Sequence, residues 1–143
     1  METNKVLSIG SFDAVHAGHA SLFRFCEQFG DVTIGVNSDE FIKKYKGNET
    51  LYTYEERADI IRRLGYTVVK NESAGRELIE QVEPDFLVIG SDWLRKDYLE
   101  QIDVTPDFLD ERDISLIYTP YFRGISTTDI KRRIGESYRT SNS

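Results

Sequence analysis

Residues Ser8 to His19 read "SIGSFDAVHAGH", and this stretch joins the end of a predicted strand to the start of a predicted helix. The run that leads into it from Lys5 is nearly continuously apolar, as is typical of a strand covered on both faces of a parallel sheet. Small residues, an acid and then His16 and His19 follow, and these are the only two histidines of the chain. In open α/β sheets, ligands bind beyond the carboxyl ends of the strands, so we expect a ligand site in this stretch.

Strand-like and helix-like patterns alternate along the rest of the chain. The strand patterns are KVLSIGSF, DVTIGVNS, TVVKN, DFLVIGS and ISLIYTP, and the helical patterns cover residues 19–29, 39–46, 54–64, 75–82 and 127–138. Thr53 and Glu56 form a capping-box pattern at the start of the third helix, and Ser126 with Asp129 resembles one at the start of the last. Alternation with short connections predicts right-handed crossovers, a parallel sheet and an α/β fold.

The length predicts a single domain. A chain of 143 residues can bury roughly two thirds of its unfolded surface, which is enough for a sizeable core. We expect one domain over residues 1–138 and a flexible tail over residues 139–143. The single cysteine, Cys26, cannot form an internal disulfide, and its apolar neighbours predict a buried packing role.

Charge and hydropathy exclude several classes of partner. The net charge of −7 argues against a protein that coats nucleic acid or binds a membrane surface. No stretch reaches the ~18 apolar residues of a membrane span, and the N-terminal residues lack the apolar core of a signal peptide. We therefore expect a cytoplasmic protein. Local basic clusters such as Lys43–Lys46 still allow a phosphorylated small molecule in a cleft.

His16 and His19 stand three residues apart at the predicted start of the first helix, so their side chains share one face of a helical turn. Backbone N–H groups without helical partners and the positive end of the helix dipole meet there, and these donors suit phosphate oxygens. A zinc site is the alternative, but carboxylates would have to complete it, because the chain has one cysteine and no third histidine. Gly10, at the strand end, would let a ligand approach the backbone closely.

A second anion-binding pattern is RGISTTDIKRRI, residues 123–134. Gly124 allows a tight turn, residues 126–128 place hydroxyls and amides at a helix start, and Arg123 adds a charged donor before the turn. An ordinary well-capped helix is the alternative for this segment taken alone. Facing each other, the two segments could hold the three phosphates of one nucleoside triphosphate.

The two motifs resemble those of a known enzyme superfamily. GSFDAVHAGH is similar to the G-x-F-D-x-x-H-x-G-H signature of the nucleotidyltransferases, and RGISTTDIK is similar to the I-S-T-T motif of their cytidylyltransferase branch. The nearest likeness is to the glycerol-3-phosphate cytidylyltransferase family. NSDEF, YEER and IGSDW also occur in that family's order, so the resemblance runs from about Lys5 to Ile134.

The resemblance implies a fold, a reaction and partners. The fold is a Rossmann-like α/β three-layer sandwich with a mainly parallel five-stranded sheet. The enzyme would move CMP from CTP to a small phosphorylated acceptor such as glycerol 3-phosphate and release pyrophosphate, assisted by Mg²⁺. The acceptor phosphate would attack the α-phosphorus in line, so catalysis would be mostly positioning and electrostatic stabilisation. The resemblance also implies a homodimer.

The resemblance assigns roles to single residues as well. The catalytic candidates are His16, His19, Lys46 and Arg123. The nucleotide-binding candidates are Gly10, Ser11, Phe12, Ala17, Gly18, Arg57, Asp92, Trp93, Gly124, Ile125, Ser126, Thr127 and Thr128. The acceptor-binding candidates are Asp13, Lys44 and Arg76, and no protein ligand of the metal is assigned.

Four of these assignments have alternatives. Lys44 competes with Lys46 as the basic residue that the family brings over the phosphates. Arg57 either reaches the site or forms an ion pair on the helix surface. Asp13 could position the first loop, contact the acceptor or help to place the metal, and Trp93 could face the nucleobase or pack in the core.

The chain departs from the glycerol-phosphate pattern at three places. Tyr121 stands where that family has the arginine of R-T-E, with Arg123 nearby as a replacement charge. Gly65 stands where a second helix arginine is expected, which leaves the identity of the base open. Only Arg76 remains as a phosphate-binding candidate in ESAGRELIEQ, and the longer stretch LEQIDVTPDFLDERDIS predicts an extra helix near the acceptor or a subunit interface.

Two other functions remain open from the sequence. VNSDEFIKKYKG and STTDI also resemble the heptose-phosphate adenylyltransferase branch, which uses ATP and a sugar phosphate. The second is a nucleotide-binding sensor that keeps the pocket without turnover. Acceptor-dependent turnover would separate the two transferase readings from the sensor.

Overall fold

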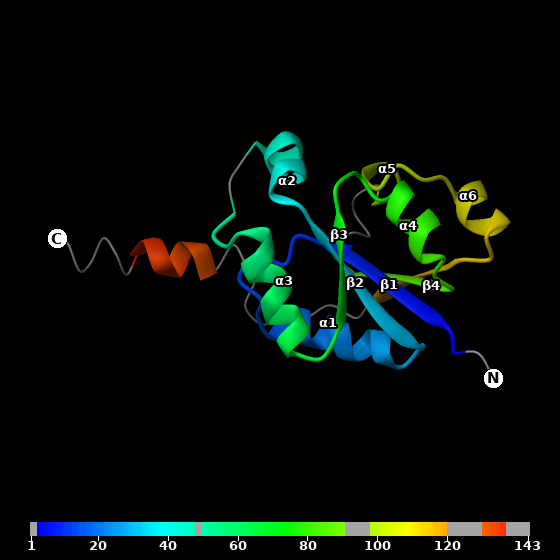
Figure 1. The fold of residues 1–143 in the computed structure, drawn as a ribbon, viewed down its shortest axis with the longest axis horizontal. Helices are drawn as coiled ribbons and strands as arrows, with labels where there is room; N and C mark the ends of the chain where they lie inside the picture. Colours follow the sequence, from blue (N-terminus) through cyan, green and yellow to red (C-terminus); the bar gives the residue numbers. More distant parts are fainter. Residues whose placement is uncertain (1–2, 48–49, 91–97, 120–129, 137–143) are drawn as a thin grey trace.

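The computed structural model describes residues 3–47, 50–90, 98–119 and 130–136 of the chain. Its centre is a five-stranded sheet with the strand order β3-β2-β1-β4-β5 (Figure 1). The strands are β1 Lys5–Gly10, β2 Asp31–Asn37, β3 Thr67–Asn71, β4 Phe86–Gly90 and β5 Ser115–Thr119. Every neighbouring pair in this sheet is parallel, so the predicted Rossmann-like α/β fold is confirmed.

The strand order reverses at β1, which pairs with β2 on one side and with β4 on the other. The β1–β2 ladder runs over six residue pairs, whereas the β1–β4 ladder covers only Val6 and Leu7. Beyond that ladder, the hydroxyl of buried Ser8 donates a hydrogen bond of 2.8 Å to the carbonyl of Val88. The ladder thus stops before the carboxyl ends of β1 and β4, and sheets of this kind bind ligands at such a switch point.

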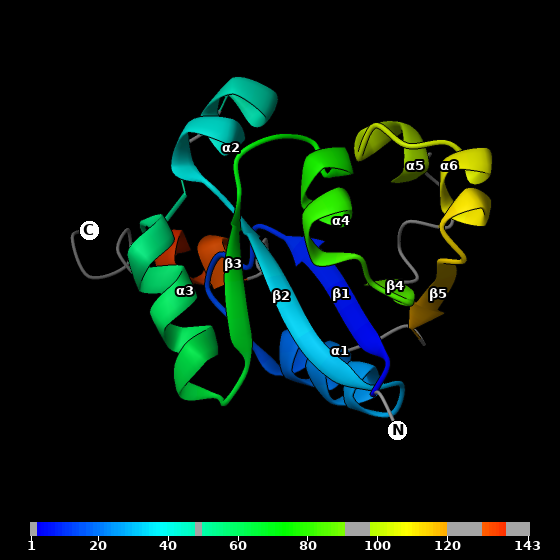
Figure 2. The same cartoon turned by 45° about the vertical axis from the view of Figure 1, so that its right-hand side comes forward.

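Helices cover both faces of the sheet (Figure 2). One face carries α1 Ala17–Glu27 and α3 Tyr54–Arg63, and the other carries α4 Arg76–Val82, α5 Tyr98–Gln101 and α6 Pro106–Glu111. Helix α2, Asp39–Lys46, follows β2 at the carboxyl-end rim. Successive side chains of a strand point to opposite faces of the sheet. Accordingly, Val6 packs with Cys26 of α1 on one face, and Leu7 packs with Leu78 of α4 on the other. This alternation produces the three-layer sandwich.

Capping side chains determine where α1 and α3 begin. The sequence pattern predicts that the first helix starts at His19, but α1 begins at Ala17, because the side chain of His16 caps it. The predicted capping box of α3 is confirmed. The Glu56 amide donates to the Thr53 hydroxyl over 3.2 Å, and the Thr53 amide donates to the Glu56 carboxylate over 3.0 Å.

The stretch before β5 forms two short helices, α5 and α6, where the sequence predicts one additional helix. Thr105 separates them by capping α6, with its hydroxyl accepting a bond of 3.1 Å from the Phe108 amide. In the ranges that the structure describes, no helix has the length and apolar character needed to cross a membrane.

The single cysteine is a core residue. Cys26 is fully buried in the cluster that α1 forms with β1 and β4. Burial raises the pKa of its thiol to about 12, so the reactive thiolate is absent near neutral pH. The predicted packing role is confirmed.

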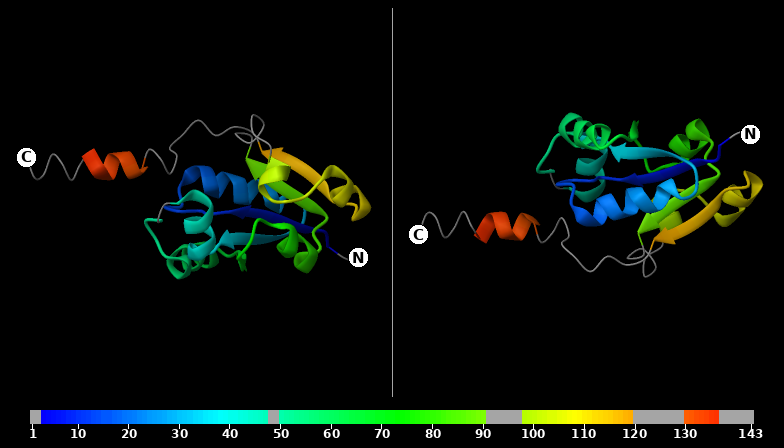
Figure 3. Two further views of the ribbon diagram at one scale, coloured as in Figure 1. Left: turned by 90° about the horizontal axis from the view of Figure 1, so that it is seen from above. Right: turned by 90° about the horizontal axis from the view of Figure 1, so that it is seen from below.

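A last helix, residues 130–136, lies beyond the carboxyl end of β1, away from the sheet (Figure 3). It falls within the helix predicted for residues 127–138, and the remainder of that prediction lies outside the described residues. Lys131 of this helix contacts Asp13 of the loop after β1. The helix therefore reaches the region in which the sequence predicts the site.

Candidate functional site

The histidine pair caps the N-terminus of α1. His16 is the N-cap residue, and its Nδ1 accepts a hydrogen bond of 3.0 Å from the amide of Gly18. In return, the His16 amide donates to Nδ1 of His19 over 3.2 Å. The two imidazoles thus take the places that Ser or Thr and Glu fill in an ordinary capping box. The Gly18 amide is used in the cap, so its predicted contact with a nucleotide stays a prediction.

These caps decide which ring nitrogen carries the proton. An Nδ1 atom that accepts a hydrogen bond bears no proton, so a neutral ring in this position is protonated at Nε2. The rings of His16 and His19 stack with their centroids 3.9 Å apart and 28° between their planes. Neither Nε2 atom has a hydrogen-bond partner among the residues that the structure describes. The pair therefore presents two neutral N–H donors at one helix terminus.

Burial keeps both imidazoles neutral at physiological pH. It lowers the pKa of His16, and it lowers the pKa of His19 to about 4, an effect to which the charge of the neighbouring His16 adds. The pair therefore supplies donors without a positive charge of its own. The positive end of the α1 dipole supplies part of the potential that an anion needs.

The loop between β1 and α1 has an unusual backbone. Phe12 and Ala14 have φ angles of 51° and 54°, in the left-handed region that costs a non-glycine residue about 1–3 kcal/mol. The ring of Phe12 covers Gly10, where an added Cβ would approach the ring to 2.9 Å. The same ring stands edge-on to His19 with centroids 5.4 Å apart. Gly10 thus makes room for Phe12, and Phe12 supports His19, while their predicted nucleotide contacts stay predictions.

A row of polar side chains crosses the carboxyl ends of three strands. The amide of Asn71 donates to Asn37 over 2.8 Å, and the amide of Asn37 donates to the hydroxyl of Ser11 over 3.2 Å. This row orients the Ser11 hydroxyl, which is a predicted nucleotide contact. The two asparagines did not figure among the sequence candidates, although each is the last residue of its strand. Their position at the ligand-binding edge is the signal that could have found them.

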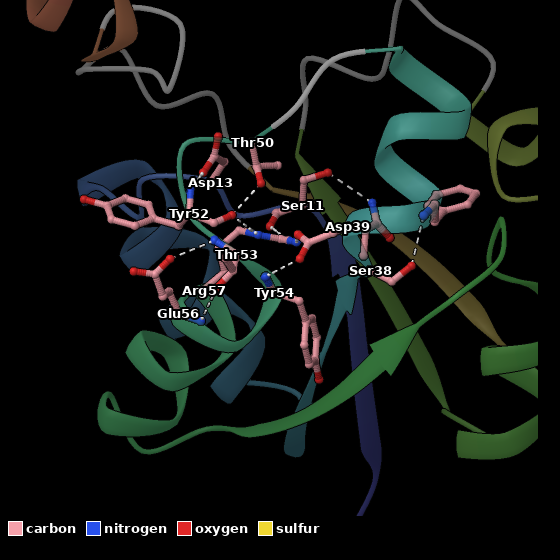
Figure 4. A network of polar contacts seen from close by, with 12 residues as sticks. Ser11, Asp13, Ser38, Asp39, Thr50, Tyr52, Thr53, Tyr54, Glu56 and Arg57 are labelled. Atoms are coloured by element: carbon pink, nitrogen blue, oxygen red, sulfur yellow. Dashed lines mark hydrogen bonds and ion pairs between the residues drawn. The ribbon is translucent and has the colours of Figure 1, made fainter.

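Arg57, on α3, connects three segments at the rim of the site. Its side chain is fully buried, and its three nitrogen groups donate to the Ser11 carbonyl (2.6 Å), the Asp39 carboxylate (2.7 Å) and the Tyr52 carbonyl (3.1 Å) (Figure 4). Burial would raise the pKa of Asp39, but the amide of Tyr54 and the guanidinium of Arg57 outweigh burial and hold that pKa below its usual value. Arg57 does form an ion pair, in which its own side chain is fully buried while that of Asp39 is 45% exposed at the rim.

Asp13 faces the connection between α2 and α3. Its buried carboxylate accepts hydrogen bonds from the amides of Leu51 (2.8 Å) and Tyr52 (3.0 Å), and Lys131 lies 3.1 Å from it. Of the three roles that the sequence leaves open for Asp13, these contacts favour positioning of the loop. A contact of Asp13 with the acceptor stays a prediction.

Lys44 and Lys46 both belong to α2 at the rim of the sheet. Lys44 is exposed, and the structure does not describe the side chain of Lys46, so it does not choose between the two. The remaining candidates lie outside the described residues; they are Asp92, Trp93, Arg123, Gly124, Ile125, Ser126, Thr127 and Thr128. Ala17, the first residue of α1, is exposed beside the histidine cap.

Arg76 begins α4, on the opposite face of the sheet from α1. Its Nε donates to the carbonyl of Asp103 over 2.8 Å, and its guanidinium lies 4.7 Å from the ring centre of Phe108. It borders a pocket of about 450 Å³ between the start of α4 and the α5–α6 segment. The described contacts of Arg76 thus lie with α5 and α6 and not with the histidine pair, and its role toward an acceptor stays a prediction.

The described residues do not fit a magnesium site built from protein ligands. No group of three or more His, Cys, Asp or Glu side chains in the described ranges is placed to hold a metal ion. Asp13, the carboxylate nearest the histidines in sequence, already binds two amides and a lysine. Because Mg²⁺ commonly binds through substrate phosphates and water, the magnesium implied by the resemblance would enter the site with a nucleotide.

Comparison with known families adds a match over most of the chain. A family model described as cytidylyltransferase-like matches residues 7–133. The bifunctional protein HldE of Aliarcobacter butzleri is 34% identical over 142 residues, covering 96% of this chain and 28% of that protein. The HldE protein of Helicobacter pylori is 38% identical over 99 residues, covering 66% of this chain and 21% of that protein. The chain thus spans between a fifth and a third of the length of these curated relatives.

Two solved structures share the fold. The lipopolysaccharide core biosynthesis protein of Thermoplasma volcanium superposes with a TM-score of 0.67 at 17% identity, covering 85% of this chain and 99% of that one. A protein of unknown function from Archaeoglobus fulgidus superposes with the same TM-score of 0.67 at 21% identity, covering 85% of this chain and 93% of that one. At these identities the likeness shows the fold alone.

Proposed function

Because this chain belongs to the cytidylyltransferase-like family of nucleotidyltransferases, we propose that it moves a nucleoside monophosphate from a nucleoside triphosphate to a small sugar phosphate and releases pyrophosphate. The observation that carries the proposal is the stacked pair of His16 and His19. Both Nδ1 atoms are used in the helix cap, which leaves both Nε2–H groups to donate to a ligand. Two such donors at a helix N-terminus match the oxygens of an α-phosphate.

The proposed step is a direct displacement. An oxygen of the acceptor phosphate forms a bond to the α-phosphorus while the bond from that phosphorus to the bridging oxygen breaks, and the electron pair leaves with pyrophosphate. An ionised phosphate needs no base to activate it, so the protein's task is to place the two reactants and to stabilise the charge. Magnesium would accompany the triphosphate and shield its charge.

The neutral state of the histidines suits this task. Charge on the α-phosphate oxygens and on the departing oxygen changes during the displacement, and hydrogen-bond donors aimed at the place where charge develops lower the barrier. Interactions that hold the substrate and the transition state equally well add nothing to the chemical step. Removing one such donor costs about 10²–10³-fold in rate in other enzymes that work this way. We expect losses of this size for each histidine.

For the donor nucleotide we propose ATP ahead of CTP. The sequence expectation placed CTP first, on the likeness of the I-S-T-T motif. The curated relatives to which this chain is similar are HldE proteins, and residues 36–47 also resemble the heptose-phosphate adenylyltransferase branch. Gly65, in place of a helix arginine, agrees with a base other than cytosine. The description of the family model keeps CTP as the second candidate.

The test measures pyrophosphate release with Mg²⁺ and either ATP or CTP, against a panel of sugar 1-phosphates, glycerol 3-phosphate and phosphoethanolamine. Release that depends on ATP and a sugar phosphate supports the proposal, and release that depends on CTP and glycerol 3-phosphate supports the second candidate. Tight nucleotide binding without release for any acceptor would favour a sensor. The variant His16→Asn serves as the control for background hydrolysis, because asparagine keeps a cap for α1 but has no imidazole.

A further inference from the structure

Three polar residues stand at one level of the sheet, at the ends of three neighbouring strands. Asn37 is the last residue of β2 and pairs in register with Asn71, the last residue of β3. β1 ends one register position earlier, at Gly10, so Ser11 follows it at the level of Asn37. Because the strands are parallel, all three residues lie at the carboxyl-end edge of the sheet, where ligands bind in folds of this kind.

The hydrogen bonds along this row have one direction. Nδ2 of Asn71 donates to Oδ1 of Asn37 over 2.8 Å, and Nδ2 of Asn37 donates to Oγ of Ser11 over 3.2 Å. A carboxamide has one accepting end and one donating end, so the Asn37 end that faces the hydroxyl is its NH₂ group. Ser11 therefore accepts from Asn37, and the hydrogen of its own hydroxyl is left for another group.

Both ends of the row are held in place. Asn71 is 1% exposed, and its carbonyl accepts the amide of Ser38 over 2.9 Å. At the other end, the carbonyl of Ser11 accepts a bond of 2.6 Å from the buried side chain of Arg57 (Figure 4). The backbone of Ser11 is thus fixed by α3 while its hydroxyl is fixed by β2. The direction in which the hydroxyl can donate is limited accordingly.

The hydroxyl of Ser11 joins a set of hydrogen-bond donors. In the described part of the chain it donates to no group, and Nε2 of His16 and of His19 has no partner there either. Phe12, the neighbour of Ser11, has its ring edge-on to the ring of His19. The carboxylate of this loop, on Asp13, is already engaged by two amides and a lysine. Donors of this kind select a ligand that presents acceptors, and the ionised oxygens of a phosphate are strong acceptors.

We propose that Asn37 and Asn71 are positioning residues, which make the Ser11 hydroxyl a donor to a phosphate oxygen of a bound substrate. The inference rests on the proposed function and adds a third donor to the two imidazoles. Hydrogen bonds that point the same way along a row polarise one another, so the asparagines also strengthen the hydroxyl as a donor. The phosphate belongs either to the triphosphate or to the sugar phosphate, and the test separates these two sources.

The main variant is Asn37→Asp. It keeps the size of the side chain and an acceptor for Asn71, but a carboxylate accepts the hydrogen of the Ser11 hydroxyl and so withdraws it from the ligand. Asn71→Leu removes the start of the row without adding charge. Asn4→Asp is the matched control, because this exposed residue precedes β1 at the opposite end of the sheet and brings the same change in net charge. The control should match the wild type.

A double-mutant cycle with Ser11→Ala separates the effect through the hydroxyl from the effect of charge. Calorimetric titration measures the binding of ATP and of CTP, each with Mg²⁺, and NMR titration measures the binding of inorganic phosphate as a probe for the acceptor. Ser11→Ala should weaken binding of the affected probe roughly 10-fold or more, Asn37→Asp at least as much, and Asn71→Leu roughly 2- to 5-fold.

The second background gives the decisive comparison. In Ser11→Ala, the effect of Asn37→Asp should shrink by a factor of about 5 or more, because charge repulsion remains but the hydroxyl is gone. The effect of Asn71→Leu should vanish in that background. A residue that acts only on stability would lower the unfolding temperature in both backgrounds and show no such coupling in the binding of a ligand.

Coupling in nucleotide binding assigns the hydroxyl to the triphosphate, and coupling in phosphate binding alone assigns it to the acceptor; either result supports the inference. Equal effects of Asn37→Asp in the two backgrounds, or wild-type binding in Ser11→Ala, would overturn it. Coupling without turnover of any nucleotide would overturn the proposed function alone, and turnover without coupling would overturn the inference alone. Binding of none of the three probes would overturn both.

Discussion

The double use of His16, as a helix cap and as a donor, predicts that two substitutions will separate stability from activity. His16→Ala removes the acceptor of the Gly18 amide and the imidazole together. His16→Asn removes the imidazole but offers a short side-chain oxygen to the same amide, and asparagine is among the best N-cap residues. Both variants therefore lose the imidazole donor, but only His16→Ala also loses the helix cap.

The magnitudes follow from the two roles. Loss of an N-cap costs about 1 kcal/mol, so His16→Ala should unfold at a temperature lower by roughly 3 °C, whereas His16→Asn should lie within about 0.5 kcal/mol of the wild type. Loss of the Nε2–H donor should lower kcat/KM about 10²-fold or more in both variants, which corresponds to about 2.7 kcal/mol of transition-state stabilisation. Most of the kinetic loss should fall on kcat.

The assay pairs urea unfolding with pyrophosphate release at saturating acceptor. Two results would refute the reasoning, each in a different way. If His16→Asn retains turnover within about threefold of the wild type, Nε2–H of His16 is not the donor that stabilises the transition state. If His16→Asn is as unstable as His16→Ala, the side chain of His16 does not contribute to stability through the cap.

Three further predictions concern residues around the pair. His19, with a pKa of about 4, takes up no proton in the folded chain between about pH 6.5 and 4 while the unfolded chain does, so stability should fall as pH drops through that window. Urea unfolding should show that His19 contributes a loss of at most about 2 kcal/mol from pH 7 to 5, which His19→Gln removes while the contribution of His16 remains, and an unchanged pH profile in that variant would contradict the assignment. Arg57→Met strands two carbonyls and should lower the free energy of unfolding by about 3 kcal/mol, and a loss below about 1 kcal/mol would show that its buried contacts are not structural. Gly10→Ala brings a Cβ within 2.9 Å of the Phe12 ring, so it should cost about 1–3 kcal/mol and reduce turnover, and wild-type kcat would show that the ring can move without disturbing His19.

The local patterns of the sequence predicted the architecture because they act over short distances. Apolar runs typical of strands, separated by segments with helical periodicity, are enough to predict a parallel sheet. The spacing of three residues between His16 and His19 is enough to predict that both side chains lie on one turn of a helix. The start of α1 was predicted at His19, two residues after its true start at Ala17, because imidazole is not an expected capping group.

The supporting contacts of the site were not predictable, because they join segments that are distant in sequence. The residues next to Asp13 in the sequence do not indicate that Leu51 or Lys131 is its partner. The burial of Arg57 depends likewise on carbonyls and a carboxylate from three other segments. These contacts form only when the chain folds, and the local patterns of one sequence do not predict them.

The most direct test of the central claim follows the α-phosphate itself. The wild-type chain would be incubated with Mg²⁺, a sugar 1-phosphate and ATP labelled at the α-phosphorus, with CTP labelled in the same way in a parallel reaction. The account predicts that the label appears in a new product joined to the acceptor, that pyrophosphate forms in equal amount, and that His16→Asn slows the formation of both about 10²-fold or more. Label released only as free nucleoside monophosphate, or no product with any phosphorylated acceptor and either nucleotide, would contradict a nucleotidyltransferase built on this histidine pair.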